Sequence, residues 1–255
     1  MVVGLDIFAE HFKGYENHYA LIGGVACDLA MDALGETFRR TKDIDIVLCL
    51  ESLTPAFVRH FWDFIKAGGY DTRQKSTGRK LFYRFHSPAN KGYPFMLELF
   101  SRIPDALDYK GQRSLTPIPA EDEASSLSAI LLDDEYYSFI QAGKIEMEGV
   151  TVLRPEYIVP LKAKAWLDLT ARKRSGEKID GTDIKKHRND VFRLYRILTP
   201  DSIPRVTRRV ADDLKAFTDT VLADNEIPLK NFGYPNAEKS SMVVTAIRKL
   251  YGVDS

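Results

Sequence analysis

The sequence predicts an α/β (α+β) domain, a mixed sheet flanked by helices, followed by a mainly helical C-terminal domain. The first 154 residues alternate short apolar runs, typical of strands, with amphipathic stretches typical of helices. Beyond Arg154-Pro155 the long stretches carry helical periodicity instead. We therefore predict two domains, residues 1–154 and 155–255, since Pro155 is acceptable at the first position of a helix.

The N-terminal domain is predicted to alternate between helices and strands. Its expected helices cover residues 5–17, 25–34 and 53–67, the last ended by Gly68-Gly69. Its expected strands cover residues 19–22, 43–50, 70–75, 80–86 and 94–100, and residues 144–153 form a hairpin turning at Glu148-Gly149. The acidic stretch 101–144 is expected to hold a helix or two. Further helices are expected over residues 161–174, 185–198, 203–225 and 238–250.

The turn after the first expected strand has the features of a phosphate-binding site. The apolar run Ala20-Leu21-Ile22 ends in Gly23-Gly24, and a helix is expected next. Glycines at such a turn let main-chain N–H groups approach a phosphate, and the helix dipole favours the negative charge. The alternative is a tight strand-to-helix turn without a ligand.

An acidic pair follows on the next expected strand. Asp43 and Asp45 are two residues apart, so both carboxylates project from one face while Ile44 and Ile46 point into a core. Two close like charges repel each other, and a divalent cation makes such a pair tolerable. Mg²⁺ suits the pair because it takes few protein oxygens and completes its shell with water and phosphates. The alternative is a solvated strand end.

The Gly23-Gly24 turn, the helix and the Asp43-x-Asp45 strand together resemble the hallmark of the DNA polymerase β-like nucleotidyltransferase superfamily. The sequence LIGGVA … RRTKDIDI is more specifically similar to the corresponding sequence of the AbiEii-type abortive-infection toxins. The resemblance implies a nucleotidyltransferase fold, a nucleoside triphosphate (NTP) as substrate and two Mg²⁺ ions held by Asp43 and Asp45. It also assigns Gly23, Gly24 and Thr41 to nucleotide binding.

A third acid, Glu98, lies within the apolar run FMLELF, where an isolated carboxylate is costly to bury. It is expected either to pair with a cation or to ligate the metal. In sequence order it occupies the place of the third acidic residue of the superfamily. A solvent-facing glutamate on an edge strand is the alternative.

The resemblance also assigns residues of the helical domain. AbiEii-type proteins carry a lysine at the start of this region, which maps to Lys162 with Lys164 as the competing choice, and the resemblance implies contact with nucleotide phosphates. The acid of the closing Lys-x-x-x-Asp helix maps to Asp190, with Asp168 as the other candidate. A solvent-facing lysine is the alternative for Lys162. Ion pairs between residues four apart, Lys164–Asp168 and Lys186–Asp190, are also possible.

Composition limits the class of protein. With 44% hydrophobic and 28% charged residues, the 255-residue chain fits a globular protein. No apolar run approaches the ~18–20 residues of a membrane helix, and the N-terminus lacks the features of a signal peptide. Cys27 and Cys49 lie among apolar residues and do not make a disulfide framework. The protein is therefore expected to be cytoplasmic, without a membrane partner.

Charge is unevenly spread, although the net charge is zero. The segment from Lys162 to Arg209 holds 14 Lys+Arg against 6 Asp+Glu, a net charge of +8. A basic region beside an acidic metal-binding region suits a polyanionic substrate, whereas solvated helix faces are the alternative. The run Arg172-Lys173-Arg174 is expected to be a solvated loop, and contact with the substrate is the second interpretation.

Together with the resemblance, these features predict a Mg²⁺-dependent nucleotidyltransferase that moves a nucleoside monophosphate from an NTP to an acceptor hydroxyl. The resemblance implies tRNA as the acceptor, and a protein hydroxyl is the other possibility. The resemblance adds the expectation of a toxin with a cognate antitoxin. The expected catalytic residues are Asp43, Asp45, Glu98, Lys162 and Asp190, and the first three are also the expected metal ligands. The rival hypotheses are a catalytically inactive nucleotide-binding or regulatory module and a small-molecule (antibiotic) nucleotidyltransferase.

Overall fold

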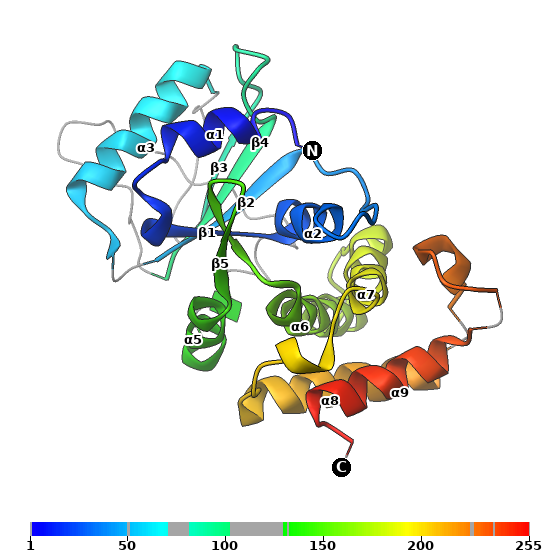
Figure 1. Ribbon diagram of the computed structural model, residues 1–255. Helices are drawn as coiled ribbons and strands as arrows, with labels where there is room; N and C mark the ends of the chain where they lie inside the picture. Colours follow the sequence, from blue (N-terminus) through cyan, green and yellow to red (C-terminus); the bar gives the residue numbers. More distant parts are fainter. Residues whose placement is uncertain are drawn as a thin grey trace. The chain divides into compact units, whose positions relative to one another are not determined.

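The computed structural model describes residues 2–49, 52–70, 82–102, 130–131, 133–224, 227–236 and 238–254. The chain forms two compact units (Figure 1). Unit 1 comprises residues 1–132 and 141–154, and unit 2 comprises residues 133–140 and 155–255. Whether these units are separate domains with the predicted bounds stays a prediction. The expected strand over 70–75 lies, apart from Tyr70, outside the described residues, as does the stretch 103–129.

Unit 1 contains a six-stranded mixed sheet, which confirms the predicted architecture. Its strands are β1 (Tyr19–Ile22), β2 (Asp43–Leu48), β3 (Phe82–His86), β4 (Met96–Phe100), β5 (Lys144–Met147) and β6 (Val150–Leu153), in the order β3-β4-β2-β1-β6-β5. β1 is antiparallel to β2 and parallel to β6, and β2 is parallel to β4. β5 and β6 form the predicted hairpin, with positive φ at both Glu148 and Gly149, as a two-residue type I′ turn requires.

Helices cover both faces of this sheet. They are α1 (Leu5–His11), α2 (Gly23–Asp32) and α3 (Pro55–Gly68). α3 packs on the face that carries Ile44, because its Phe61 ring contacts Phe85 of β3 and strand register aligns Phe85 with Ile44 through β4. α2 begins on the opposite face, against Asp45. The sheet therefore has an apolar face under α3 and a face with acidic residues beside α2.

Several element boundaries differ from the predicted ones for local reasons. α1 ends at His11 rather than at residue 17, and Gly14 with φ +86° separates it from a short 3₁₀ helix, η1 (Glu16–His18). α3 begins at Pro55 because the side chain of Thr54 accepts a hydrogen bond from the N–H of Phe57. Gly69, with φ +63°, ends α3 as predicted.

Unit 2 is helical, as predicted. It includes most of α5 (Asp134–Ala142), then α6 (Pro155–Arg174), α7 (Gly181–Tyr195), α8 (Arg208–Ala223) and α9 (Ser240–Tyr251), with 3₁₀ helices η3 (Pro200–Ser202) and η4 (Leu229–Phe232). α6 is central, since it packs against both α7 and α8. The rings of Trp166 on α6 and Phe217 on α8 meet edge to face, with centroids 5.2 Å apart. α7 begins earlier than predicted because Asp180 caps its start by accepting from the N–H of Thr182.

Within the described ranges, no helix has both the length and the apolar character needed to span a membrane.

Candidate active site

Gly23 brings the start of α2 against the carboxylate of Asp45. Its φ is +65°, a left-handed conformation that residues with side chains rarely adopt. A β-carbon at this position would lie 1.8 Å from Asp45 Oδ2, so the carboxylate fits only beside a glycine. The preceding residue, Ile22, pairs with Asp45 across β1 and β2, and this pairing places Gly23 next to the Asp45 side chain. The turn thus requires glycine for its conformation and for its closeness to an acid.

Gly24 packs against Thr41 in the same way. A β-carbon at Gly24 would lie 2.6 Å from Thr41 Oγ1 and 2.8 Å from Thr41 Cβ. The three residues predicted for nucleotide binding, Gly23, Gly24 and Thr41, therefore lie together. The first turn of α2 contains no acidic residue, and no side chain caps it in the described part of the chain. Its N–H groups and the helix dipole are consequently suited to an anion.

Asp43, Asp45 and Glu98 lie on one face of the sheet. β2 and β4 are parallel, with Asp45 opposite Glu98 and Asp43 opposite Met96. Because side chains alternate along a strand and paired residues share a face, all three carboxylates project to the same side. The three acids are half-buried, whereas Ile44 between the two aspartates is completely buried on the other face. The predicted separation of an acidic and a core face is therefore present.

Glu98 pairs with an arginine that the sequence pattern did not reveal. Arg84 on β3 stands opposite Glu98, and its Nε donates a hydrogen bond of 2.7 Å to Oε1 of Glu98. The side chains are only 10% and 13% exposed, so the pair compensates charges that would be costly to bury singly. β4 lies between β2 and β3, so the alternative of a solvent-facing Glu98 on an edge strand is wrong. Arg84 becomes recognisable as its partner only once the register of β3 and β4 is known.

The acidic face fits Mg²⁺ when a phosphate shares the coordination. No group of three His, Cys, Asp or Glu side chains within the described ranges is arranged to hold a metal ion, so Asp43, Asp45 and Glu98 do not form a complete cage. Two neighbouring carboxylates still suit Mg²⁺, which uses few protein oxygens and takes the others from water and phosphates. A phosphate at the N-terminus of α2 would lie next to Asp45. The metal role of these acids stays a prediction.

In unit 2, the structure joins the predicted residues Lys162 and Asp190 to each other. Lys162 Nζ on α6 lies 3.3 Å from Asp190 Oδ2 on α7, and the two side chains are 8% and 0% exposed. Arg193 Nη1 donates a hydrogen bond of 3.1 Å to the other oxygen of Asp190. Asp190 therefore anchors α6 to α7. Contact of Lys162 with a phosphate stays a prediction. Its ammonium would have to bind the phosphate together with Asp190, or leave Asp190 for the phosphate.

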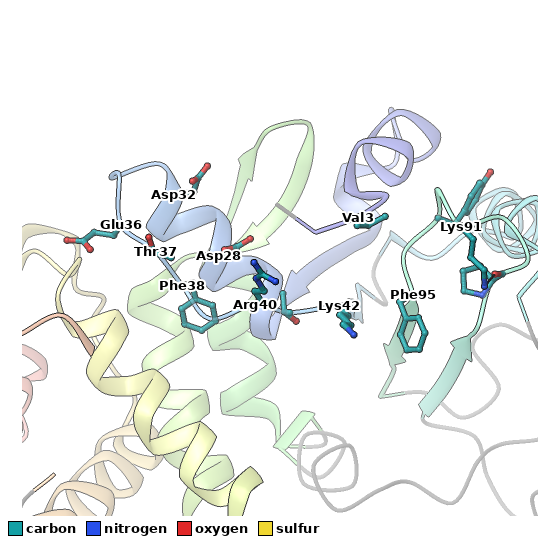
Figure 2. Close-up of a pocket in the computed structure, with 13 residues that line it drawn as sticks. Val3, Asp28, Asp32, Glu36, Thr37, Phe38, Arg40, Lys42, Lys91 and Phe95 are labelled. Carbon is teal, nitrogen blue, oxygen red and sulfur yellow. Dashed lines mark hydrogen bonds between the residues drawn. The ribbon is translucent and has the colours of Figure 1, made fainter. Parts of the chain in front are cut away.

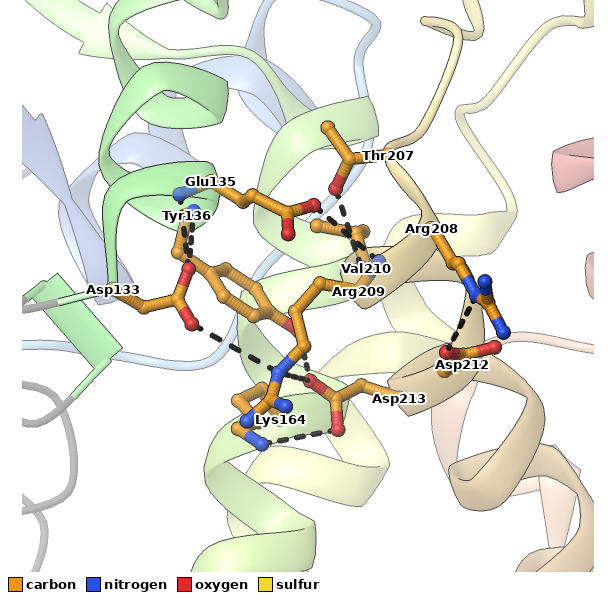
Figure 3. A network of polar contacts seen from close by, with 10 residues as sticks. All are labelled: Asp133, Glu135, Tyr136, Lys164, Thr207, Arg208, Arg209, Val210, Asp212 and Asp213. Atoms are coloured by element: carbon orange, nitrogen blue, oxygen red, sulfur yellow. Dashed lines mark hydrogen bonds and ion pairs between the residues drawn. The ribbon is translucent and has the colours of Figure 1, made fainter.

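The competing residue Lys164 belongs to another network in unit 2, shown in Figure 3. Its Nζ lies 3.0 Å from Oδ1 of Asp213 on α8, whose Oδ2 accepts a hydrogen bond from the hydroxyl of Tyr136 on α5. Burial, and secondarily the charge of Asp213, raise the pKa of the Tyr136 phenol. Oδ2 of Asp168 instead lies 3.8 Å from Nη1 of Arg172. The alternative of a Lys164–Asp168 pair is wrong, because Asp213 on α8 gives Lys164 a more buried carboxylate.

A groove of about 700 Å³ in unit 1 reaches the predicted nucleotide site (Figure 2). Thr41, which contacts Gly24, is part of its wall. The rest of the wall comes from Val3 before α1, from α2, from the segment that leads into β2 and from the segment that leads into β4. The sequence pattern did not reveal this groove, because it depends on the pairing of β2 with β4.

Comparisons with known proteins find structural neighbours only. No protein-family model and no curated protein matches the chain. The chain is similar to the polyadenylate synthase of Megavirus at 15% identity and a TM-score of 0.40, over 86% of this chain and 36% of that one. It is similar to the antibiotic-resistance factor ANT(2″)-Ia at 13% identity and a TM-score of 0.38, over 86% of this chain and 92% of that one. This level of likeness carries no conclusion about function, and the AbiEii-type resemblance stays a prediction.

Proposed function

We propose that this chain is a Mg²⁺-dependent nucleotidyltransferase that transfers a nucleoside monophosphate from an NTP to an acceptor hydroxyl. The proposal is carried by the contact between the glycine turn and the acidic strand. Gly23 begins a helix whose N–H groups suit phosphate, and it does so directly against the carboxylate of Asp45. A phosphate cradle beside a pair of metal-ligating carboxylates provides the two parts that phosphoryl transfer requires.

In this proposal the first turn of α2 binds the phosphates of the NTP, and Thr41 supports that turn. The acceptor oxygen forms a bond to the α-phosphorus while the bond from this phosphorus to the bridging oxygen breaks, and pyrophosphate leaves. The acceptor proton passes to a carboxylate, with Glu98 proposed either as this base or as a further metal ligand. Mg²⁺ held by Asp43 and Asp45 would neutralise charge on the phosphates and lower the pKa of the attacking hydroxyl.

The acceptor that we infer is tRNA, with a protein hydroxyl as the other possibility. The support is the net charge of +8 between Lys162 and Arg209, which suits a polyanion. The resemblance to AbiEii-type toxins adds a cognate antitoxin as a proposed partner.

One observation favours a second function, a nucleotide-binding module that transfers nothing. Arg84 donates a hydrogen bond to Oε1 of Glu98, so this carboxylate is already paired with a cation. Such a module would bind NTP at Gly23-Gly24 without turning it over.

The decisive experiment incubates the purified protein with each labelled NTP, Mg²⁺ and total tRNA, and then with protein acceptors. We expect transfer of label from one NTP, and its loss in Asp43→Asn with an unchanged circular dichroism spectrum. Asp63→Asn is the matched control, since Asp63 is a 65% exposed aspartate on α3. Full activity of Asp43→Asn would contradict the metal site. Binding of NTP without transfer to any acceptor would favour the non-catalytic module.

A further inference from the structure

Phe95 is an exposed aromatic ring beside the proposed active site. Its side chain is 53% exposed, while every other phenylalanine whose side chain the structure describes is at most 6% exposed. Phe95 directly precedes β4, whose first residue, Met96, stands opposite Asp43. A single exposed apolar side chain is ordinary on a protein surface, so the meaning of this one depends on the groups around it.

Two lysines accompany this ring. Lys42, which directly precedes Asp43, places its Nζ 5.9 Å from the centre of the Phe95 ring. Lys91 also lines the groove, with its Nζ donating to the carbonyl of Pro88 at 3.2 Å. Figure 2 shows Lys42, Phe95 and Lys91 toward one end of the groove, and Asp32 and Glu36 at the other. One end of the groove therefore carries two lysines beside the exposed Phe95 ring, and the other carries Asp32 and Glu36, with Arg40 between them.

The strand register places the end with the two lysines at the edge of the acidic site. β2 and β4 are parallel, so Lys42 and Phe95 lie one residue before Asp43 and Met96, at the same end of these two strands. Thr41 belongs both to the groove and to the packing around Gly24. A chain-like ligand lying on Phe95 could thus present its terminus to the acidic face.

We propose that this end of the groove binds the acceptor as a single-stranded nucleic acid, with a base stacked on Phe95 and phosphates beside Lys42 and Lys91. The proposal rests on the proposed nucleotidyltransferase function and names its substrate class. Aromatic stacking next to cationic side chains is the general way in which proteins hold unpaired strands. The carboxylates of Asp32 and Glu36 repel phosphates at the far end, which confines the strand to the end near Asp43.

The test measures binding of a labelled single-stranded RNA of about 12 nucleotides by fluorescence anisotropy, without NTP. Phe95→Leu keeps an apolar side chain but removes the stacking surface, and we expect affinity to fall by about 5- to 150-fold. Phe95→Tyr keeps the stacking surface and should bind like the unchanged protein. Leu34→Ala is the matched control, since Leu34 is 63% exposed and does not line the groove.

Competitors identify the ligand. Unlabelled single-stranded RNA should displace the probe, and a duplex of the same sequence should not, because its bases are already stacked. Single-stranded DNA that competes as well as RNA would show that the site accepts both kinds of nucleic acid. Equal affinity of Phe95→Leu and the unchanged protein, or equal competition by duplex, would overturn the proposal. Binding of labelled NTP with Mg²⁺ is measured in parallel. Phe95-dependent RNA binding without NTP binding would refute the proposed function and still support this groove.

Discussion

The hydroxyl of Tyr251 donates a hydrogen bond of 2.7 Å to the main-chain carbonyl of Glu156. In a regular helix this carbonyl accepts from the N–H four residues later, but that residue is Pro160, which has none. Tyr251, the last residue of α9, therefore replaces the hydrogen bond that Pro160 removes from α6. Burial raises the pKa of the Tyr251 phenol well above its ordinary value, so the hydroxyl stays a donor.

Removing this hydroxyl should destabilise unit 2. Tyr251→Phe leaves a buried carbonyl without its partner, and we expect the free energy of unfolding to fall by about 1–3 kcal/mol. In a Pro160→Ala background the loss should be smaller, because alanine supplies the N–H that Glu156 lacks. Urea unfolding of the two single variants, the double variant and the unchanged protein measures the coupling. Equal losses in both backgrounds would contradict the proposed replacement.

The contact between Gly24 and Thr41 predicts a stability cost for any side chain at Gly24. The sequence alone suggests that a larger residue there harms ligand binding at nearly unchanged stability. The structure adds a clash with Thr41, so Gly24→Ala should cost about 1–3 kcal/mol. Thr41→Gly in the same molecule should recover part of this loss in a urea titration. Gly92→Ala, which meets its neighbours only at ordinary contact distances, is the control and should change little.

His11 and His60 form a stacked pair that should make unit 1 sensitive to acid. Their ring centroids are 4.0 Å apart, and each Nε2 bonds to the main-chain carbonyl of the other residue. Burial is the main cause that lowers the pKa of His11, and the charge of His60 lowers it further. The bond to the His60 carbonyl and the nearby Asp63 carboxylate oppose this shift.

The sign of the pH dependence follows from this lowered pKa. The unfolded chain binds the proton more tightly than the folded one, so stability is complete above the unfolded pKa of about 6.5. It declines as the pH falls below that value toward the lowered pKa of the folded state. His11→Gln should reduce the decline, since an amide donates a hydrogen bond without titrating. His86→Gln, a histidine outside the pair, should keep the full decline in thermal melts between about pH 7.5 and pH 5.5.

The parts of the fold that depend on neighbouring residues could be predicted from the sequence. The alternation in Asp43-Ile44-Asp45-Ile46 gives both the strand and its two faces. The Glu148-Gly149 turn is equally local, because two residues of positive φ suffice to define it. The glycine turn and the acidic pair come together because β1, α2 and β2 are consecutive in the chain.

Features that depend on register or on distant segments could not be predicted. Arg84 meets Glu98 only through the pairing of β3 with β4. Lys164 pairs with Asp213, which is 49 residues away in sequence, although Asp168 is only four residues away. The grouping of residues 133–140 with unit 2 likewise has no local signal, since these residues lie between segments of unit 1.

The last turn of α6 predicts how tRNA binding should respond to salt. The expectation that Arg172-Lys173-Arg174 forms a loop is wrong, because these three residues end α6. Arg172 is engaged there, since its Nε lies 2.9 Å from Oε2 of Glu177. Lys173 and Arg174, in contrast, are exposed cations. Arg172 therefore fastens the turn, and only its two neighbours are suited to phosphates. Replacing all three residues would confuse loss of charge with loss of local structure.

Lys173→Ser combined with Arg174→Ser should weaken tRNA binding and flatten its salt dependence. Each phosphate contact that is lost removes about one unit from the slope of log affinity against log salt, so two contacts lower its magnitude by about two. The control combines Arg59→Ser with Lys66→Ser, two exposed cations of α3, and removes the same charge elsewhere. Filter binding between about 50 and 200 mM salt measures both slopes, and NTP binding should be unchanged in both variants. Equal slopes would exclude this turn as an RNA contact. A protein that retains no tRNA even at about 50 mM salt, where phosphate contacts are strongest, would instead direct the search to a protein acceptor.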